Sequence, residues 1–270
     1  MTRAKKLANK KKFYLGLTYT ISEGGSARFK KKNMLTLIGP NNETVFDYQK
    51  THPVPIAEYS TESGPGGNLR VENIEIFNKI SKDSISINVS GAICLDMDFP
   101  ELLTTASEAD IVLQPAQTWS SIIGLQHLKM ASTRAIENGY WVVRCDGGGT
   151  SGLIDPLGRI RHVEFSSAAN QIFSFDLPLP LIPSNDDDES NRIRRVEKIH
   201  TIYAKYGDWT ILGSIITLFL LKVCWVALWS TRQSQMEEMW EYGANAMNVA
   251  KNWAQLNYDQ SFKNVESELM

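Results

Sequence analysis

An apolar run near the C-terminal end constrains the fold of this chain more than any other feature. Residues 209–229 read WTILGSIITLFLLKVCWVALW, with Lys222 as the single charged residue. A helix of about 20 apolar residues matches the thickness of a bilayer core. Eleven Leu, Ile, Val or Phe residues in the run favour insertion by about 0.3–0.6 kcal/mol each, against a cost of about 3 kcal/mol for one central lysine. The run therefore predicts a transmembrane helix over 209–229, in preference to a core helix of a soluble protein.

The rest of the chain has the composition of a globular domain. Of its 270 residues, 43% are hydrophobic and 21% are charged, which argues against a disordered chain. The formal net charge of −2 gives no overall basic field, so we expect no nucleic-acid partner. The three cysteines, Cys94, Cys145 and Cys224, are too few and too scattered for a disulfide framework or a zinc site. We predict no metal and no other cofactor.

Strands and helices alternate before the apolar run, which predicts a mixed α+β fold. A basic helix over 1–12 leads to a strand over 13–18, and Gly24, Gly25 and the lysines 30–32 are expected in a polar loop. The other predicted strands are 33–38, 44–48, 71–77, 85–94, 111–113, 140–144, 152–154, 160–165 and 171–175, and the predicted helices are 97–107 and 120–138. A linker over 179–208 and a polar, partly helical tail over 230–270 flank the predicted membrane span.

Two short stretches carry the residues that suggest chemistry. Lys50 and Glu58 lie in KTHPVPIAE at the end of a predicted strand, and Cys94 lies in GAICLD, where a strand gives way to a helix. A helix N-terminus and a nearby ammonium both favour the thiolate form of a cysteine. A lysine can also stabilise the oxyanion of a tetrahedral acyl intermediate. Taken alone, such a cysteine is more often an inert buried residue, and such a lysine is more often a surface charge.

The combination resembles the carbon–nitrogen hydrolase (nitrilase) superfamily, and more closely its apolipoprotein N-acyltransferase branch. The matching positions are Tyr48, Lys50, His52, Val54, Pro55 and Glu58 on the motif Y-x-K-x-H-L-V-P-F-G-E; Ile93 to Asp96 on I-C-Y-E; Gln126-His127 and Arg134 to Glu137 on Q-H-x-x-x-x-x-x-R-A-x-E; Ile154 to Arg159 on I-D-P-x-G-R; and Tyr203 to Trp209 on Y-x-R-x-G-D-W. The resemblance covers residues 1–230. It departs from the family at Leu95 and Asp96, where the motif has tyrosine and glutamate.

The resemblance implies a four-layer α-β-β-α sandwich over residues 1–178, lacking its first strand and followed by one transmembrane helix. It implies that Cys94 is the nucleophile, Lys50 stabilises the tetrahedral intermediate and Glu58 is an auxiliary carboxylate. Trp119 is expected to contact the substrate. The family's general-base glutamate would lie in a strand before residues 1–12, so it is expected to be absent from the chain. Glu23 is a poor substitute, because it is expected in a loop beyond the strand 13–18.

The resemblance also implies three alternative functions. The first is a membrane-anchored N-acyltransferase that works through a cysteine thioester, with a membrane lipid as acyl donor and an amine or lipoprotein-like acceptor. The second is an amidase or nitrilase that uses the same site and ends with water. The third is a catalytically inactive relative, because the general-base glutamate is missing. A single membrane span is expected in this chain, with more spans in a full-length form, and the side of the membrane on which the domain lies stays open.

Overall fold

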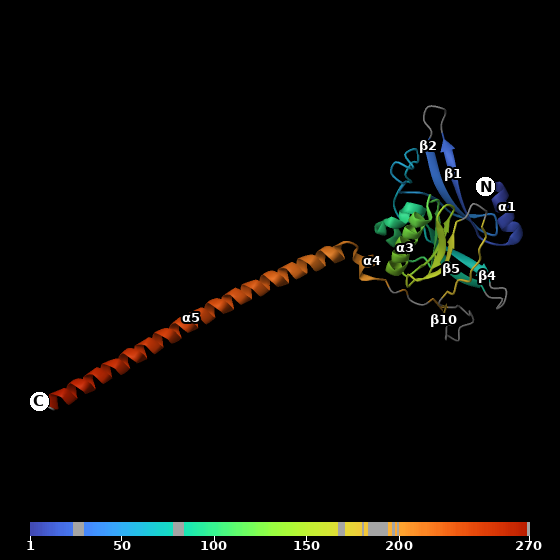
Figure 1. Ribbon diagram of the computed structural model, residues 1–270. Helices are drawn as coiled ribbons and strands as arrows, with labels where there is room; N and C mark the ends of the chain where they lie inside the picture. Colours follow the sequence, from blue (N-terminus) through green and yellow to red (C-terminus); the bar gives the residue numbers. More distant parts are fainter. Residues whose placement is uncertain are drawn as a thin grey trace. The chain divides into compact units, whose positions relative to one another are not determined.

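The computed structural model forms two units, Met1–Gly207 and Asp208–Met270, which are described separately (Figure 1). The structure describes residues 1–23, 30–77, 84–166, 171–179, 181–182, 194–195, 198 and 200–268. The glycines predicted in the polar loop, Gly24 and Gly25, and half of the predicted linker lie outside these residues.

The first sheet of the N-terminal unit has three antiparallel strands in the order β1-β2-β3: Leu15–Glu23, Lys30–Ile38 and Thr44–Gln49. The helix α1 (Thr2–Lys11) precedes β1 and lies against β2. Two predictions are wrong here, because the lysines 30–32 begin β2 and Glu23 ends β1. Cross-strand pairing explains the longer strands: Glu23 lies opposite Lys30 in register, and its carboxylate bonds Lys32 at 3.0 Å.

The second sheet has six strands in the order β4-β5-β6-β7-β8-β9. These are Glu72–Phe77, Ser84–Gly91, Ile111–Ala116, Trp141–Asp146, Thr150–Ile154 and Ile160–Phe165. The pairs β5-β6 and β6-β7 are parallel, and the other pairs are antiparallel. The prediction of one strand over 85–94 is corrected, because β5 ends at Gly91 and Cys94 begins a short 3₁₀ helix, η1 (Cys94–Asp98). The single helix predicted over 97–107 is correspondingly divided between η1 and α2 (Pro100–Thr104).

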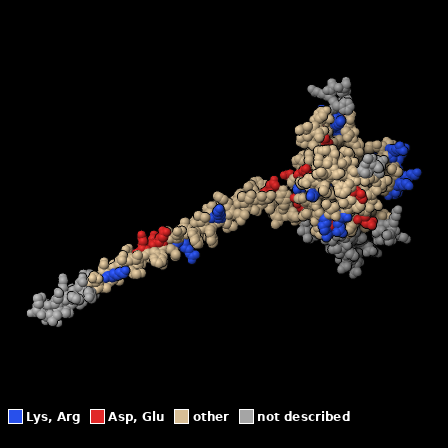
Figure 2. Space-filling model, viewed as in Figure 1, with Lys and Arg blue, Asp and Glu red and all other residues tan. Residues whose placement is uncertain are grey.

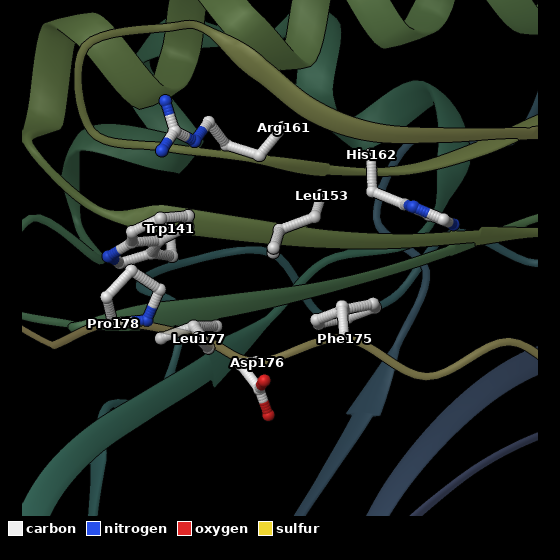
Figure 3. A pocket seen from close by; sticks show the side chains of 8 residues that line it. All are labelled: Trp141, Leu153, Arg161, His162, Phe175, Asp176, Leu177 and Pro178. Carbon is white, nitrogen blue, oxygen red and sulfur yellow. The ribbon is translucent and has the colours of Figure 1, made fainter.

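The predicted strand over 171–175 is wrong: these residues pair with no strand in the described part of the chain. Side-chain contacts hold this segment instead, since Phe173 stacks on His162 of β9 with ring centroids 5.6 Å apart. The residues that follow wall a cavity of about 420 Å³ over β7, β8 and β9 (Figure 3). The cavity is lined by Trp141, Leu153, Arg161, His162, Phe175, Asp176, Leu177 and Pro178.

Two buried clusters hold the layers together. One lies between the two sheets and contains Leu35, Leu37, Phe46, Ile74, Ile87, Val89, Ile93 and Cys94. The other lies between the large sheet and the helices α2 and α3 (Ser121–Asn138), and includes Leu103, Val112, Leu128, Ala131, Val142 and Ile154. The α3 helix ends at Gly139, whose φ of 69° suits a glycine. Two packed sheets with helices outside them confirm the predicted mixed α+β sandwich.

Short elements complete the N-terminal unit: the pair β10 (Leu181–Ile182) and β11 (Arg194–Arg195), and the helix α4 (Ile202–Tyr206). The second unit is one helix, α5 (Trp209–Glu268), so the structure continues the helix through the predicted tail. An 18-residue window within its stretch 209–252 has a mean hydropathy of 2.3, and this is the one helix among the described residues that is long and apolar enough to cross a membrane. Charged side chains are sparse along its first part and return further along (Figure 2).

Candidate active site

Cys94 lies at the turn between β5 and η1, at the end of the large sheet. Cys94 is 7% exposed, and its φ of 52° places its backbone in the left-handed region. This conformation is costly for a residue with a side chain and is characteristic of sites where neighbouring contacts impose it. One such contact is the bond of 3.1 Å from the Ile93 backbone N–H to the Asp96 carboxylate, which closes the turn.

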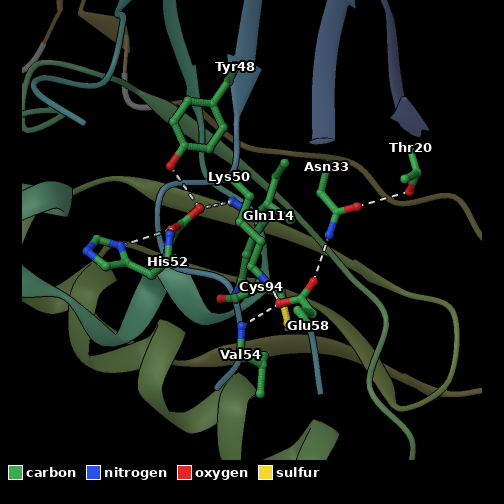
Figure 4. A network of polar contacts seen from close by, with 11 residues as sticks. Thr20, Asn33, Tyr48, Lys50, His52, Val54, Glu58, Cys94 and Gln114 are labelled. Carbon is green, nitrogen blue, oxygen red and sulfur yellow. Dashed lines mark hydrogen bonds and ion pairs between the residues drawn. The ribbon is translucent and has the colours of Figure 1, made fainter. Parts of the chain in front are cut away.

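Lys50 and Glu58 form a buried pair beside this turn. Lys50 directly follows β3 and is 1% exposed, and its Nζ lies 2.5 Å from Oε2 of Glu58. The same carboxylate accepts from the Val54 backbone N–H at 2.5 Å and from Nδ2 of Asn33 at 2.7 Å. Three donors therefore fix the position of Glu58, and Glu58 fixes the Lys50 ammonium (Figure 4).

The pair and the cysteine line one cavity of about 490 Å³. Its other lining residues include Trp119, which is 67% exposed, and Pro115 to Gln117 at the end of β6. The structure thus brings together all four predicted site residues, from segments that are up to 69 positions apart in the sequence, Lys50 to Trp119. Glu58 is the one carboxylate among the described residues that line this cavity.

The protonation of Cys94 reflects opposing effects. Burial raises the pKa of the Cys94 thiol, while the Lys50 ammonium, the Arg144 guanidinium and the backbone N–H of Gln117 oppose that rise. The helix-dipole argument made from the sequence contributes little here, because η1 has only five residues. The cations and the Gln117 amide are therefore the groups that favour the thiolate.

Asp96 ties the lysine-bearing segment to the cysteine turn. It is fully buried, and Oδ1 accepts from the backbone N–H of His52 at 2.8 Å and lies 3.0 Å from its Nδ1. Oδ2 accepts from the Tyr48 hydroxyl at 2.8 Å. Burial and the neighbouring carboxylate raise the pKa of Tyr48, so its hydroxyl stays a donor. The aspartate that replaces the glutamate of the family motif thus keeps the two segments together.

Sequence reasoning missed the contributions of Asn33, Gln117 and Asp96 to the site. Asn33 and Gln117 act through a side-chain amide and a backbone N–H, and neither leaves a motif in the sequence. Asp96 did leave a signal, as a carboxylate two residues after the cysteine. No group of three or more His, Cys, Asp or Glu residues that could hold a metal occurs in the described part of the chain.

Comparison with known proteins agrees with this geometry. A family model described as carbon-nitrogen hydrolase matches residues 1–182, about two thirds of the chain. The chain belongs to the carbon-nitrogen hydrolase family. This membership accounts for the arrangement of two sheets with outer helices. It also identifies the resemblance noted in the sequence as a true relationship at the level of the family.

Curated proteins that are similar to this chain are named apolipoprotein N-acyltransferases. That of Rickettsia bellii is 28% identical over 192 residues, covering 67% of this chain and 35% of the relative. That of Pseudomonas putida is 33% identical over 144 residues, covering 47% and 27%. The chain thus spans about a third of the length of these relatives.

Solved structures that are similar to this chain include amidases. A mutant of the amidase from Nesterenkonia sp. AN1 in complex with butyramide matches at a TM-score of 0.49 and 19% identity. The match covers 61% of this chain and 62% of the amidase.

Proposed function

We propose that Cys94, Lys50 and Glu58 form the site of a membrane-anchored acyltransferase of the N-acyltransferase type, which works through a cysteine thioester. The observation that carries the proposal is that the thiol and the Lys50–Glu58 pair line the same cavity. Membership of an enzyme family and similarity to apolipoprotein N-acyltransferases support it.

In the first half-reaction, the Cys94 thiolate adds to the carbonyl carbon of an acyl ester. The carbonyl oxygen becomes an oxyanion, which the Lys50 ammonium stabilises. The intermediate then expels the alcohol of the donor, which leaves with the proton that the thiol lost, and the acyl group stays on sulfur. In the second half-reaction, an amine attacks the thioester, the nitrogen loses a proton, and the sulfur leaves as a thiolate.

Glu58 serves this chemistry by holding Lys50, since its carboxylate accepts bonds from Lys50, Val54 and Asn33. The described residues place no second carboxylate in the cavity. Loss of a positioned general base typically lowers a rate by about 10²–10⁴-fold. We therefore expect acylation of Cys94 to be detectable and turnover to be slow.

The apolar helix supports a lipid as acyl donor. A span over 209–229 would anchor the chain in a membrane, where a phospholipid ester is at high local concentration. The names of the relatives suggest the terminal amine of a lipoprotein as acceptor. The choice of donor and acceptor therefore rests on these relatives, since the cavity itself admits any acyl group that fits about 490 Å³.

Labelled phospholipid tests the proposal directly. The full chain is reconstituted in vesicles that contain phosphatidylethanolamine with a ¹³C-labelled acyl chain, and the peptide with Cys94 is analysed by mass spectrometry. We expect a labelled, hydroxylamine-sensitive adduct at Cys94 that is absent in Cys94→Ala. Cys145→Ser is the matched control and should keep the adduct. Release of ammonia from simple amides without any adduct would favour the amidase alternative, and neither adduct nor hydrolysis would indicate an inactive relative.

A further inference from the structure

Asp146, at the end of β7, is a buried carboxylate that the chemistry above does not use. It is 3% exposed and accepts four bonds. Two come from Thr118, from its backbone N–H at 2.9 Å and its hydroxyl at 2.8 Å. The others come from Nη2 of Arg144 at 2.6 Å and the Gly148 backbone N–H at 3.2 Å. Burial raises the pKa of Asp146, but these donors outweigh it and hold the pKa below its usual range, so the carboxylate stays charged.

The glycines 147–149 pack closely against residues 117 and 118, the segment from which Asp146 accepts two of its bonds. A Cβ at Gly148 would lie 1.9 Å from the Thr118 carbonyl oxygen, and one at Gly149 would lie 1.9 Å from the Thr118 hydroxyl. A Cβ at Gly147 would lie 2.3 Å from the side-chain oxygen of Gln117. The Gly147 backbone N–H also donates to the carbonyl of Ala116 at 3.1 Å. The Thr118 backbone at Gly148 cannot move aside, and Gly149 is enclosed by Thr118, Asp146 and Gly124, so both positions require glycine, whereas at Gly147 the Gln117 side chain could give way.

The loop held in this way forms part of the cavity wall. Ala116, Gln117 and Trp119 line the cavity together with Cys94, and Thr118 lies buried between them. Gln117 and Cys94 line the same cavity, and the backbone N–H of Gln117 lowers the pKa of the Cys94 thiol. Gln117 directly precedes Thr118, the residue that donates two bonds to the Asp146 carboxylate.

We propose that Asp146 is a positioning residue for Cys94, which with the glycines 147–149 fixes the loop 116–119 so that the Gln117 N–H stays directed at the reacting sulfur. This inference rests on the proposed function, in which the thiolate is the reacting species. Without the two bonds from Thr118 to Asp146, the loop is less fixed and the backbone N–H of Gln117 can turn away from Cys94. The same two bonds set the position of Trp119 at the mouth of the cavity.

The pH dependence of alkylation at Cys94 tests this role without requiring turnover. Iodoacetamide labelling of the full chain in detergent micelles is followed between pH 6 and 10, and the peptide with Cys94 is quantified by mass spectrometry. Asp146→Asn replaces one accepting oxygen with an NH₂ group, which cannot accept from Thr118 or Arg144. We expect the midpoint of labelling to rise by about one pH unit, which means about tenfold slower labelling well below the midpoint.

Asp155→Asn is the matched control. Asp155 is 2% exposed and also accepts bonds from backbone N–H groups and an arginine, at 2.9 Å from Arg159 N, 3.0 Å from Leu157 N and 2.7 Å from Arg159 Nε. It does not line the cavity. We expect this variant to lose stability while its labelling midpoint stays at the wild-type value.

Thr118→Val keeps the test decisive if Asp146→Asn does not fold, because it removes only the hydroxyl bond and leaves the buried charge paired with Arg144. It should raise the midpoint in the same direction by a smaller amount. Unchanged midpoints in folded Asp146→Asn, or in Thr118→Val if the first variant is unfolded, would overturn the inference. If Cys94 fails to react in the wild-type chain as well, the proposed function itself is wrong.

Discussion

Replacing Lys50 with methionine separates the structural role of the Lys50–Glu58 pair from its chemical role. Lys50 is 1% exposed, the Glu58 side chain is 21% exposed, and their charged atoms lie 2.5 Å apart. Removing one partner of a buried ion pair costs about 3–5 kcal/mol. Glu58 keeps its bonds from Asn33 and Val54 after Lys50→Met, so we expect the lower end of this range, about 3 kcal/mol.

The double variant Lys50→Met/Glu58→Gln completes a thermodynamic cycle. Each single change leaves a charge in the cavity wall without its partner, whereas the double change removes both charges. The cost of the double variant should therefore be smaller than the sum of the single costs, with a coupling energy of about 1–3 kcal/mol. Urea unfolding of the full chain in micelles, followed by tryptophan fluorescence, measures these differences.

Cysteine reactivity should not follow stability through this cycle. The Lys50 ammonium is the first of the groups that oppose the effect of burial on the pKa of Cys94. Lys50→Met and the double variant should therefore both label with iodoacetamide about tenfold more slowly at pH 7, the equivalent of about one pKa unit. Recovery of labelling in the double variant would refute this reasoning. So would a cost below about 0.5 kcal/mol for Lys50→Met, which is typical of an exposed pair.

Three further outcomes are expected. Bonds from Leu157 and Arg159 hold the pKa of Asp155 below its usual range despite its burial. The charged group therefore adds stability above about pH 4, and this stability is lost as pH falls further. Asp155→Asn should weaken the fall in unfolding free energy between pH 6 and pH 2, and an unchanged fall would contradict this. Asp96→Asn should cost about 2–4 kcal/mol in urea unfolding, because a buried carboxylate loses an acceptor for its donors, and wild-type stability would exclude the role of Asp96 in joining the two segments. A second central charge, Leu218→Arg, should make the free energy of inserting the apolar helix less favourable by about 3 kcal/mol. This variant should be released on alkaline extraction of membranes, whereas Lys222→Leu should stay in the pellet. Retention of Leu218→Arg in the pellet would contradict a transmembrane helix.

The sequence predicted the order of strands and helices where local pattern determines it. The helix α3 has a capping serine before it and Asn138-Gly139 at its end, and the structure bounds it at Ser121–Asn138. The lysines 30–32 misled the prediction because cross-strand pairing with β1 overrides the local preference of a charged run for a loop. The error at 171–175 has the opposite cause: apolar residues there are typical of a strand, but in the described part of the chain the segment is held by ring contacts with His162 and pairs with no strand.

The predicted site residues came from motifs, whereas their surroundings depend on tertiary contacts. Lys50, Glu58 and Cys94 stand at motif positions, and the structure places them on one cavity. The grip of Asp146 on Thr118 joins residues 28 positions apart through two side-chain bonds. No local pattern marks such a contact. Sequence reasoning therefore found the candidate reacting groups and left out the groups that hold them in place.

The carboxylates of this site act on Cys94 in two opposite directions. The charge of Glu58 raises the pKa of the Cys94 thiol by repelling the thiolate, while its carboxylate also holds Lys50, which lowers that pKa. Asp146 holds Arg144 in the same way, and Arg144 also opposes the effect of burial. If direct repulsion dominates, removing either carboxylate increases the thiolate fraction of Cys94. If positioning of the cations dominates, removing either carboxylate decreases that fraction. Because the short bonds to the two carboxylates are what keep these cations buried beside the sulfur, we expect positioning to dominate, and both Glu58→Gln and Asp146→Asn to make Cys94 less reactive.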